Sequence, residues 1–366
     1  MTLARNLGRF DFAVVGAGIA GASLAAGLAR HGTVVLLEAE AQPGYHSTGR
    51  SAAFWTESYG GPAVVPLTRA SGPFLRDHGF LGARGALTIA RRGSEARIEA
   101  FAARYAALDV RVELLGQADL NLRIPGLRPD WVLGALEPDC SDIDVAALHQ
   151  HWLDEARRGG AQLLASARLV GAAPDRKGWQ LSLADGTRGT SSVLVNAAGA
   201  WADEVAALAG VRPLGITPYR RTVAQLRTAP APPTDLPLVL DLDGQFYFKP
   251  EAGRLWLSPH DETRCPPSDA APEEIDVATA ISRLEAVVDW RVERVEHRWA
   301  GLRSFAPDRL PVYGFDPLSP GFFWFAGQGG FGIQTAPAAA ELAVSLLTGT
   351  PGGTVDPGPY GPIRFY

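Results

Sequence analysis

The sequence predicts a mixed α/β fold with two parts, one built around a parallel sheet and the other around an antiparallel sheet. Three observations support this prediction. Residues 11–38 pass from strand through glycine turn and helix to a second strand. Glycine turns precede further helices near residues 199 and 330. Residues 217–260 alternate apolar and polar positions, which is typical of half-buried strands.

Composition limits the classes of protein to which the chain can belong. Its 366 residues, of which 46% are hydrophobic, are enough for two domains. The net charge is −5 and the arginines are scattered, so we expect no nucleic-acid partner. Cys140 and Cys265 fit a reducing cytoplasm, and a single disulfide between them is the open alternative. The histidines show no metal-ligand spacing, so no metal site is predicted.

Residues 11–38 contain the first three predicted elements. Phe12–Val15 is a short apolar strand, Ser23–Arg30 continues as a helix rich in small residues, and Thr33–Leu37 is a second strand. Residues 12–29 are uncharged, but they hold four glycines and are rich in alanine, so they are weakly hydrophobic for a membrane span. No clear cleavage site supports a signal peptide. We therefore expect a cytoplasmic protein with no transmembrane segment.

The glycine turn in this unit has the pattern G-x-G-x-x-G and precedes an acidic residue at the end of the second strand. Gly16 permits the tight turn, Gly18 lets the backbone approach a pyrophosphate, and Gly21 lets the helix pack against the strand. The pyrophosphate would lie at the helix N-terminus, where free N–H groups favour an anion. Glu38 can accept hydrogen bonds from a ribose hydroxyl. The unit predicts dinucleotide binding.

The remaining elements follow from periodicity and turn residues. Residues 39–60 form a loop rich in glycine, serine and threonine, and long ordered loops are often functional. Helices are predicted over residues 62–78, 95–108, 144–158 and 272–290, and after the glycine turn at 327–332. Strands are predicted over residues 162–164, 167–173, 179–183, 192–195, 299–305 and 322–325, and within 217–260.

These elements predict a discontinuous domain organisation, because glycine turns suited to a cofactor occur at both ends and in the middle of the chain. Residues 1–58, 140–216 and 300–366 are assigned to the cofactor domain. Residues 59–139 and 217–299 are assigned to a sheet-rich substrate domain.

Seven segments, in order along nearly the whole chain, carry a resemblance to a known family. They are VVGAGIAGAS (14–23), EAEAQPGYHSTGRSAA (38–53), NAAGAWAD (196–203), GVRPLG (210–215), FYFKPEAG (246–253), WAGLRSF (299–305) and GQGGFGIQT (327–335). The chain resembles the FAD-dependent amine and amino acid oxidoreductases that include D-amino acid oxidase, glycine oxidase and monomeric sarcosine oxidase. Within this family it is most similar to bacterial D-arginine dehydrogenase.

The resemblance implies a Rossmann-type FAD-binding domain with an antiparallel-sheet substrate domain, and FAD held without a covalent bond, since no Cys or His stands at a matching attachment position. Residues matched to the adenosine diphosphate half are Gly16, Gly18, Ile19, Ala20, Gly21, Glu38, Ala39 and, on the adenine side, Val170. Residues matched to the flavin half are Ser47, Thr48, Arg50, Ser51, Ala52, Ala53, Arg303, Gly329, Gly330, Phe331, Gly332, Ile333, Gln334 and Thr335. The junction at Ala198, Gly199 and Trp201 is a further candidate cofactor contact.

The family reaction transfers a hydride from the carbon that bears the amine to flavin N5, which converts an amino acid into an imino acid. Arg303 matches the carboxylate-binding arginine, because a planar guanidinium binds a carboxylate through two parallel hydrogen bonds. Arg221 and Tyr247 match further substrate contacts, and Tyr59 matches a tyrosine over the flavin. Gly330 and Gln334 complete the predicted catalytic group at the flavin edge.

Two departures from D-arginine dehydrogenase affect the expected substrate. Phe54 stands where that enzyme has a histidine, and Ala86 stands where it has a glutamate that pairs with a guanidinium. Since an unpaired buried cation is costly, we expect D-amino acids with apolar or aromatic side chains in place of cationic ones. Thr56, Leu238 and Leu240 complete the predicted pocket. We expect the nearby acid Glu57 to face solvent; pointing inward, it would restore cation binding.

Two further hypotheses stay open at this point. Phe54 and Trp55 would form an aromatic wall suited to a secondary or cyclic amine or an N-methyl amino acid, and a flavin-binding assembly subunit is a non-enzymatic alternative. The related sarcosine oxidases use a lysine near N5 for oxygen, but residues 254–260 contain none, and we expect Lys249 to point elsewhere. We therefore favour a dehydrogenase that passes electrons to a quinone over an oxidase that uses O2.

Overall fold

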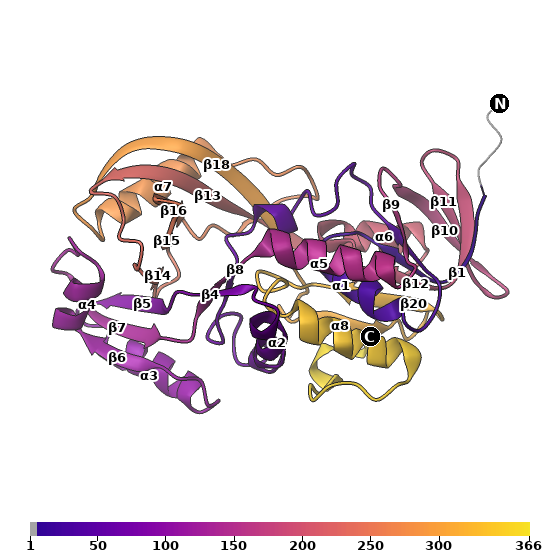
Figure 1. The fold of residues 1–366 in the computed structure, drawn as a ribbon, viewed down its shortest axis with the longest axis horizontal. Coiled ribbons are helices and arrows are strands. Elements are labelled where there is room, and N and C mark those ends of the chain that lie inside the picture. The colour runs from indigo at the N-terminus through magenta and orange to yellow at the C-terminus, as the bar shows by residue number, and fades with distance from the viewer. Residues whose placement is uncertain (1–5) are drawn as a thin grey trace.

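The computed structural model describes residues 6–366, so the first five residues of the predicted cofactor domain lie outside the description. Two large sheets lie side by side along the long axis of the molecule (Figure 1). The eight strands of the first sheet are β1 (Asn6–Val15), β2 (Val34–Leu37), β9 (Gln162–Leu164), β10 (Leu169–Asp175), β11 (Gly178–Leu183), β12 (Arg188–Asn196), β19 (Val312–Phe315) and β20 (Phe322–Ala326).

The first sheet has a parallel centre with the order β9-β2-β1-β12-β20, to which β10, β11 and β19 are added in antiparallel orientation. Strands buried on both faces are expected in such a sheet. Side chains alternate accordingly: Val14 and Leu36 join the core on one face, whereas Val15 and Leu37 join the core on the other. The predicted Rossmann-type unit is therefore confirmed.

Helices cover both faces of this sheet. Their bounds are α1 (Ile19–Leu28), α5 (Val145–Arg158), α6 (Ala202–Leu208) and α8 (Ala336–Thr348). Helices α1, α5 and α8 share one core with Val14 and Leu36, and α6 shares the opposite core with Val15. The small side chains of α1, among them Ala22 and Ala25, are buried and let the helices pack closely.

The second sheet has nine strands. They are β5 (Ala86–Arg91), β6 (Glu113–Gly116), β7 (Trp131–Glu137), β13 (Thr217–Ala229), β14 (Leu238–Asp241), β15 (Tyr247–Glu251), β16 (Arg254–Ser258), β17 (Thr263–Arg264) and β18 (Arg291–Phe305). The long antiparallel pair β13–β18 reaches from this sheet toward the first (Figure 1). Helices α3 (Glu95–Ala106), α4 (Gln117–Arg123) and α7 (Glu274–Glu285) pack against this part of the chain.

The second sheet corrects the expectation of a wholly antiparallel arrangement in one place. Strand β14 pairs in parallel with β5, with Leu238 opposite Ala86 and Leu240 opposite Thr88. The two strands come from distant segments, so no hairpin turn between them forces an antiparallel pairing. The parallel pair brings two predicted pocket positions, Ala86 and Leu238, next to each other.

A small sheet and one helix lie between the two large sheets (Figure 1). They are β3 (Phe54–Trp55), β4 (Leu81–Ala83), β8 (Ser141–Ile143) and α2 (Val65–Asp77). Trp55 packs here with Leu75 and Phe80, and its indole nitrogen donates to the Thr68 carbonyl at 2.9 Å. The proposed aromatic wall of Phe54 and Trp55 is therefore wrong, because successive strand residues point to opposite sides.

Other predicted elements differ in their limits. The strand expected over residues 299–305 begins at Arg291, and the helix expected to reach residue 290 ends at Glu285. All strands of the eight-stranded sheet fall in the segments assigned to the cofactor domain, while β18 crosses the assigned boundary at residue 300. The domain limits remain a prediction.

In residues 6–366 no helix is long and apolar enough to cross a membrane, and both cysteines are free.

Candidate active site

The first glycine turn has the close contacts that a dinucleotide-binding unit needs. Gly16 has a φ of +100°, where L side chains are strained. A Cβ on Gly16 would lie 2.6 Å from the Ala197 carbonyl oxygen, and one on Gly21 would lie 1.8 Å from the Gly16 oxygen. A Cβ on Gly18 would lie 3.2 Å from Thr48 Oγ1. The turn, strand and helix therefore pack closely only with glycine at these positions.

Polar groups around this turn are arranged for a phosphate and a ribose. Helix α1 begins at Ile19, whose N–H donates to Thr48 Oγ1 at 3.0 Å, and other N–H groups of the first helical turn have no intrahelical acceptor. Glu38 at the end of β2 accepts from the N–H groups of Ala17 and Glu40, both at 2.9 Å. Each carboxylate oxygen keeps lone-pair capacity for a ribose hydroxyl.

A cavity extends from this turn to the β13–β18 pair. Many of the predicted cofactor and substrate residues line it. They are Gly18, Ile19, Ala20, Glu38, Ser47, Thr48, Arg50, Ser51, Ala52, Ala198, Gly199, Trp201, Arg221, Tyr247, Arg303, Gly329, Gly330, Gly332 and Ile333.

Other predicted residues lie outside this lining. They are Gly16, Gly21, Ala39, Ala53, Phe54, Thr56, Tyr59, Ala86, Val170, Leu238, Leu240, Phe331, Gln334 and Thr335. Gly16 and Gly21 act through packing, as described above. Val170 is 46% exposed on β10. The Thr335 hydroxyl donates to the Phe331 carbonyl at 2.9 Å, so it stabilises the start of α8.

The loop after β2 is held by its own side chains. Ser47 donates to the Leu302 carbonyl at 2.7 Å. Arg50 donates to the carbonyls of Ala270 at 2.8 Å and Ala300 at 3.2 Å, and it forms an ion pair with Asp269. The Arg50 guanidinium thus fixes the loop against β18, and its positive charge is balanced within the protein. The glycine turn, Glu38 and this loop together fit a dinucleotide that carries a flavin.

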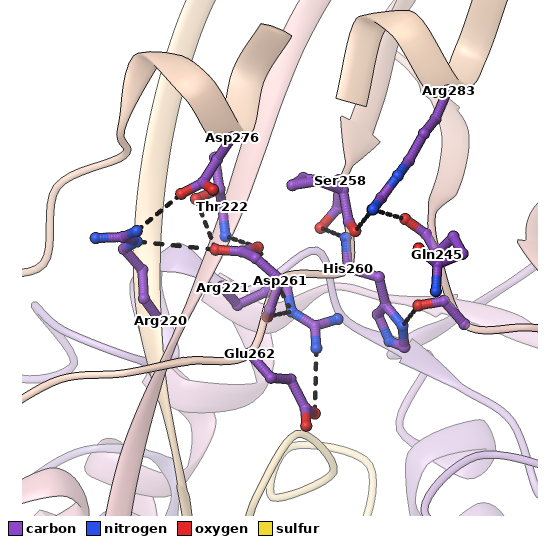
Figure 2. Close-up of polar contacts among 12 residues, drawn as sticks. Arg220, Arg221, Thr222, Gln245, Ser258, His260, Asp261, Glu262, Asp276 and Arg283 are labelled. Carbon is purple, nitrogen blue, oxygen red and sulfur yellow. Dashed lines mark hydrogen bonds and ion pairs between the residues drawn. The ribbon is translucent and has the colours of Figure 1, made fainter. Parts of the chain in front are cut away.

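The two arginines at the far end of the cavity lie on one face of the β13–β18 pair. The side chain of Arg303 makes no hydrogen bond or ion pair with any residue in 6–366. Arg221 donates from Nε to the Asp261 carbonyl at 2.8 Å and from Nη2 to Glu262 at 3.4 Å. Its Nη1 atom is buried without a hydrogen-bond partner in the described chain. Figure 2 shows the Arg221 guanidinium between Asp261 and His260.

One of these arginines has no acidic partner in the part of the chain that the structure describes. Glu262 accepts from both Arg221 and Arg309, and Asp261 lies beside both Arg220 and Arg221. Arg303 remains without an acidic partner in the described residues. Burial, and then the charge of Arg303, lower the pKa of Arg221 to about 10. A bound monoanion would relieve this repulsion.

Arg220, next in sequence to Arg221, serves the structure on the opposite face. It forms ion pairs with Asp276 at 2.9 Å and with Asp261 at 3.8 Å (Figure 2). It also forms an ion pair with Glu273. These contacts connect β13 to α7. Alternation along the strand therefore separates a structural arginine from one that lines the cavity.

Tyr59 lies against the glycine turn before α8. A Cβ on Gly330 would lie 2.5 Å from the Tyr59 hydroxyl and 3.0 Å from Arg303 Cζ. Arg303 Cζ is 5.7 Å from the centre of the Tyr59 ring, within cation–π range. The Phe54 ring packs edge-on against Tyr59 at 5.5 Å and against Tyr247 at 6.2 Å. Glycine at position 330 thus leaves space for both Tyr59 and Arg303.

An apolar cluster adjoins these aromatic rings. It contains all of the predicted pocket residues except Thr56, together with Cys140, which the sequence pattern did not indicate. Its members are Ala52, Phe54, Ala86, Cys140, Leu238 and Tyr247, with Tyr59, Leu240 and Trp256 packed at its edge.

Two ionisable residues near the site were missed by the sequence analysis. His260, in a left-handed conformation with φ +56°, donates from Nδ1 to the Gly244 carbonyl at 2.7 Å and packs edge-on against Tyr247 at 5.7 Å. Burial, and then Arg221 and Arg303, lower the pKa of His260 to about 3. Glu137 is 4% exposed at the end of β7, opposite Ala86. Only tertiary pairing brings either residue to the site, so no local pattern signals it.

Two expectations about charged side chains need correction or refinement. Glu57 does not line the cavity; it is partly exposed at the surface, where it pairs with Arg69 of α2 at 2.7 Å. Lys249 lies on the same side of β15 as Tyr247, two residues away, but it is 3% exposed and binds Asp142 at 2.7 Å and Glu251 at 3.1 Å. It does not line the cavity.

Gln334 and Thr56 contact each other and do not line the cavity. The Gln334 amide nitrogen donates to the Thr68 hydroxyl at 2.8 Å and to the Thr56 carbonyl at 3.2 Å. The Thr56 hydroxyl donates to Glu137 at 2.6 Å. Both side chains therefore hold the backbone that leads to Tyr59.

Comparison with known proteins agrees with this arrangement. Glycine oxidase from Pseudomonas aeruginosa is 30% identical over 173 residues, which cover 45% of this chain and 44% of the relative. The chain spans less than half the length of the first curated relatives that it matches.

Solved structures share the fold over nearly the whole chain. L-proline dehydrogenase from P. horikoshii aligns with a TM-score of 0.86 at 21% identity, covering 99% of this chain and 98% of that one. Glycine oxidase from Geobacillus kaustophilus aligns with a TM-score of 0.84 at 23% identity, covering 96% and 98%. These likenesses confirm the predicted fold class.

A sequence profile of the DAO family, described as FAD dependent oxidoreductase, matches residues 11–346. The profile thus spans the glycine turn, the flavin loop, both arginines and the Gly330 turn described above. The chain belongs to the DAO family of FAD-dependent oxidoreductases, and its cofactor is FAD.

Proposed function

We propose that this protein oxidises the C–N bond of an amine that carries a single carboxylate group. One observation carries the proposal: Arg303 and Nη1 of Arg221 have no partners in the described chain and lie beside two tyrosines at the end of the cofactor cavity. Two guanidinium groups suit a planar carboxylate because they can donate several directed hydrogen bonds. The Arg303 guanidinium, which has no acidic partner in the described chain, suits a monoanion.

Bound FAD supplies the two-electron acceptor for the hydride that leaves the substrate carbon. The residues of the chain bind and orient the substrate beside it. Arg303 and Arg221 would hold the carboxylate, and the hydroxyls of Tyr59 and Tyr247 would add hydrogen bonds. Phe54 and the apolar cluster would exclude water from the reacting carbon. The resulting product is an imino acid.

The apolar cluster favours substrates with apolar or aromatic side chains over cationic ones. Glu57 is paired with Arg69, and Glu137 accepts three hydrogen bonds from residues 56–58. Neither carboxylate is free to balance a substrate guanidinium, whose burial alone would be costly. The preference for D-amino acids, and the particular similarity to D-arginine dehydrogenase, rest on the sequence resemblance.

A secondary or cyclic amine is the second candidate substrate. The Phe54 ring makes edge-on contacts with Tyr59 and Tyr247, with 5.5 and 6.2 Å between the ring centres. Such a group of aromatic rings suits a small ring or an N-methyl group of the substrate. The glycine oxidase relatives and the fold shared with L-proline dehydrogenase are consistent with compact substrates of this kind.

Several finer features belong to the same proposal. Since Lys249 is bound by Asp142 and Glu251, it is not available to assist oxygen, which favours a dehydrogenase with a quinone acceptor over an oxidase with O2. FAD would be held without a covalent bond, because neither cysteine lines the cavity and His46 binds Glu40 at 3.1 Å. Two free cysteines support a cytoplasmic location.

The test is anaerobic reduction of the purified flavoprotein. The protein would be mixed with apolar D- and L-amino acids, D-arginine, N-methyl amino acids, proline and simple amines. Bleaching of the flavin would be followed near its absorption band at roughly 450 nm. Bleaching by apolar D-amino acids supports the first candidate, and bleaching only by N-substituted compounds supports the second. Equal bleaching by amines that lack a carboxylate would contradict the proposal. Air readmitted afterwards distinguishes an oxidase from a dehydrogenase by the rate of reoxidation.

A further inference from the structure

Residues 56–59, here called the Tyr59 loop, are held between two buried polar side chains from different parts of the fold. Glu137 lies at the end of β7 in the nine-stranded sheet, and Gln334 lies just before α8 in the cofactor part. Their exposures are 4% and 2%. Buried polar groups of this kind require partners, and nearly all of the partners here belong to the Tyr59 loop.

The carboxylate of Glu137 receives three hydrogen bonds from the loop. Its Oε1 accepts from the Glu57 N–H at 2.7 Å, and its Oε2 accepts from the Thr56 hydroxyl at 2.6 Å and the Ser58 N–H at 3.2 Å. The two N–H groups can only donate, so they require an acceptor at both oxygens. A carboxylate satisfies all three donors, whereas an amide would direct its NH2 group at one of them.

The amide of Gln334 holds the other side of the loop. Its Oε1 accepts from the Thr56 N–H at 3.3 Å, while Nε2 donates to the Thr56 carbonyl at 3.2 Å and to the Thr68 hydroxyl at 2.8 Å. A backbone N–H donates and a carbonyl accepts, so the two ends of the amide are distinguished by their partners. Thr56 is therefore fixed from both sides at once.

The loop ends at Tyr59, whose ring lies beside Arg303 and whose hydroxyl lies against Gly330. We propose that Glu137 is a positioning residue that, together with Gln334, holds Tyr59 over the carboxylate-binding arginines. Glu137 touches neither the substrate position nor the cofactor cavity, and it acts through the Tyr59 loop. This inference rests on the proposed function, because it assigns Tyr59 to the substrate carboxylate.

The experiment measures binding of benzoate, an aromatic monocarboxylate without an amine, from its effect on the flavin absorption of the holoenzyme. We expect Glu137→Gln to keep its FAD and to raise the benzoate dissociation constant about 10-fold, the size of one lost charge-assisted hydrogen bond. Glu113→Gln is the matched control, since Glu113 lies on the neighbouring strand β6 and its exposed carboxylate pairs with Arg111, away from the Tyr59 loop. That control should bind benzoate as the unchanged protein does.

A positioning role through Tyr59 is separated from a general structural role by combining substitutions. In a Tyr59→Ala background, Glu137→Gln should change the benzoate dissociation constant by less than about 2-fold, because the residue it positions is gone. A full effect in that background would overturn the inference. If Glu137→Gln fails to fold, Thr56→Val removes one of its three donors, and the same comparison applies with a smaller expected change.

Failure of the inference can be distinguished from failure of the proposed function. If the unchanged holoenzyme does not bind benzoate and no carboxylate-bearing amine bleaches the flavin, the carboxylate site itself is wrong, and the inference falls with it. If the unchanged protein binds benzoate and Glu137→Gln binds it equally well, only the positioning role is wrong.

Discussion

Arg221 and Arg303 lie on the same face of the antiparallel pair β13–β18, two residues apart along the strands. Arg303 is opposite Tyr219 and Arg221 is opposite Gly301, so the two guanidinium groups are diagonal neighbours across the strands. Like charges at this spacing repel each other, and the protein retains them although only one is balanced by nearby acids. Gly301, opposite Arg221, has no side chain, and a Cβ there would lie 3.4 Å from Arg50 Cβ. The pair is therefore arranged for an anion that neither strand supplies.

Arg303→Ala should weaken substrate and benzoate binding by about 10- to 100-fold, since it removes one or two charge-assisted hydrogen bonds. Arg303→Lys should recover only part of the loss, because an ammonium cannot make two parallel hydrogen bonds to a carboxylate. Arg298→Ala on the same strand is the control, as Arg298 is exposed and contacts Glu274 at 3.5 Å. Steady-state kinetics and flavin titration would check this, and equal effects at both positions would contradict it.

Gly330→Ala should lower kcat/KM strongly, because its Cβ would lie 2.5 Å from the Tyr59 hydroxyl. Removing that hydroxyl should relieve part of the clash. The double variant Tyr59→Phe, Gly330→Ala should therefore lose less activity than the sum of the losses in the two single variants. Part of the loss should remain, since Arg303 is only 3.0 Å from the same Cβ. Additive effects of the two substitutions would show that the clash lies elsewhere.

The sequence was sufficient for the parts of the fold that depend on local pattern. The G-x-G-x-x-G turn and Glu38 predict the cofactor end of the cavity because each depends on neighbours within one βαβ unit. Arg221 and Arg303 were identified by resemblance to family motifs, and the structure places both in the cavity lining. Strand alternation then explains why Arg221 lines the cavity and Arg220 does not.

Features that depend on distant contacts could not be predicted. The parallel pair β5–β14, and with it the contact of Ala86 with Leu238, joins segments about 150 residues apart. His260 and Glu137 reach the site only through tertiary pairing, and neither lies in a motif. The pairing of Glu57 with Arg69 was not predicted, because Arg69 lies on a helix whose packing the sequence does not reveal.

Gly21→Ala should abolish FAD retention, because the added Cβ would lie 1.8 Å from the Gly16 carbonyl oxygen and force α1 away from the turn. Gly171→Ala is the control, since a Cβ there meets nothing within 4 Å. FAD content, measured as the ratio of flavin to protein absorbance after purification, checks the expectation. Normal FAD content in Gly21→Ala would mean that the helix N-terminus does not hold the pyrophosphate.

Ala86→Glu should not convert the pocket to cationic substrates, although it introduces the acid that the sequence resemblance assigns to this position in D-arginine dehydrogenase. Ala86 is 3% exposed and lies opposite Glu137, so the new carboxylate would be buried beside an existing one. We expect a melting temperature several degrees lower and no bleaching by D-arginine. Ala86→Gln introduces a side chain that is nearly as large as glutamate but uncharged, so it separates the cost of the added volume from the cost of the added charge. A gain of activity on D-arginine would contradict this account.

His260 should make the folded protein less stable as the pH falls below neutrality. Burial and the neighbouring arginines lower its pKa to about 3, whereas an unfolded histidine titrates near roughly 6.5. Between these two values the unfolded chain binds a proton that the folded protein does not. The free energy of unfolding therefore decreases toward low pH, by at most about 1.4 kcal/mol per pH unit from this residue.

His260→Asn isolates this contribution, because asparagine tolerates the left-handed backbone at φ +56° and does not titrate. His149, whose pKa burial also lowers, remains in both proteins and cancels in the comparison. Denaturant unfolding at pH 7 and pH 5 should show a smaller loss of stability in His260→Asn than in the unchanged protein. Parallel losses would mean that the imidazole is already protonated in the folded state, which its burial and the two adjacent guanidinium groups argue against.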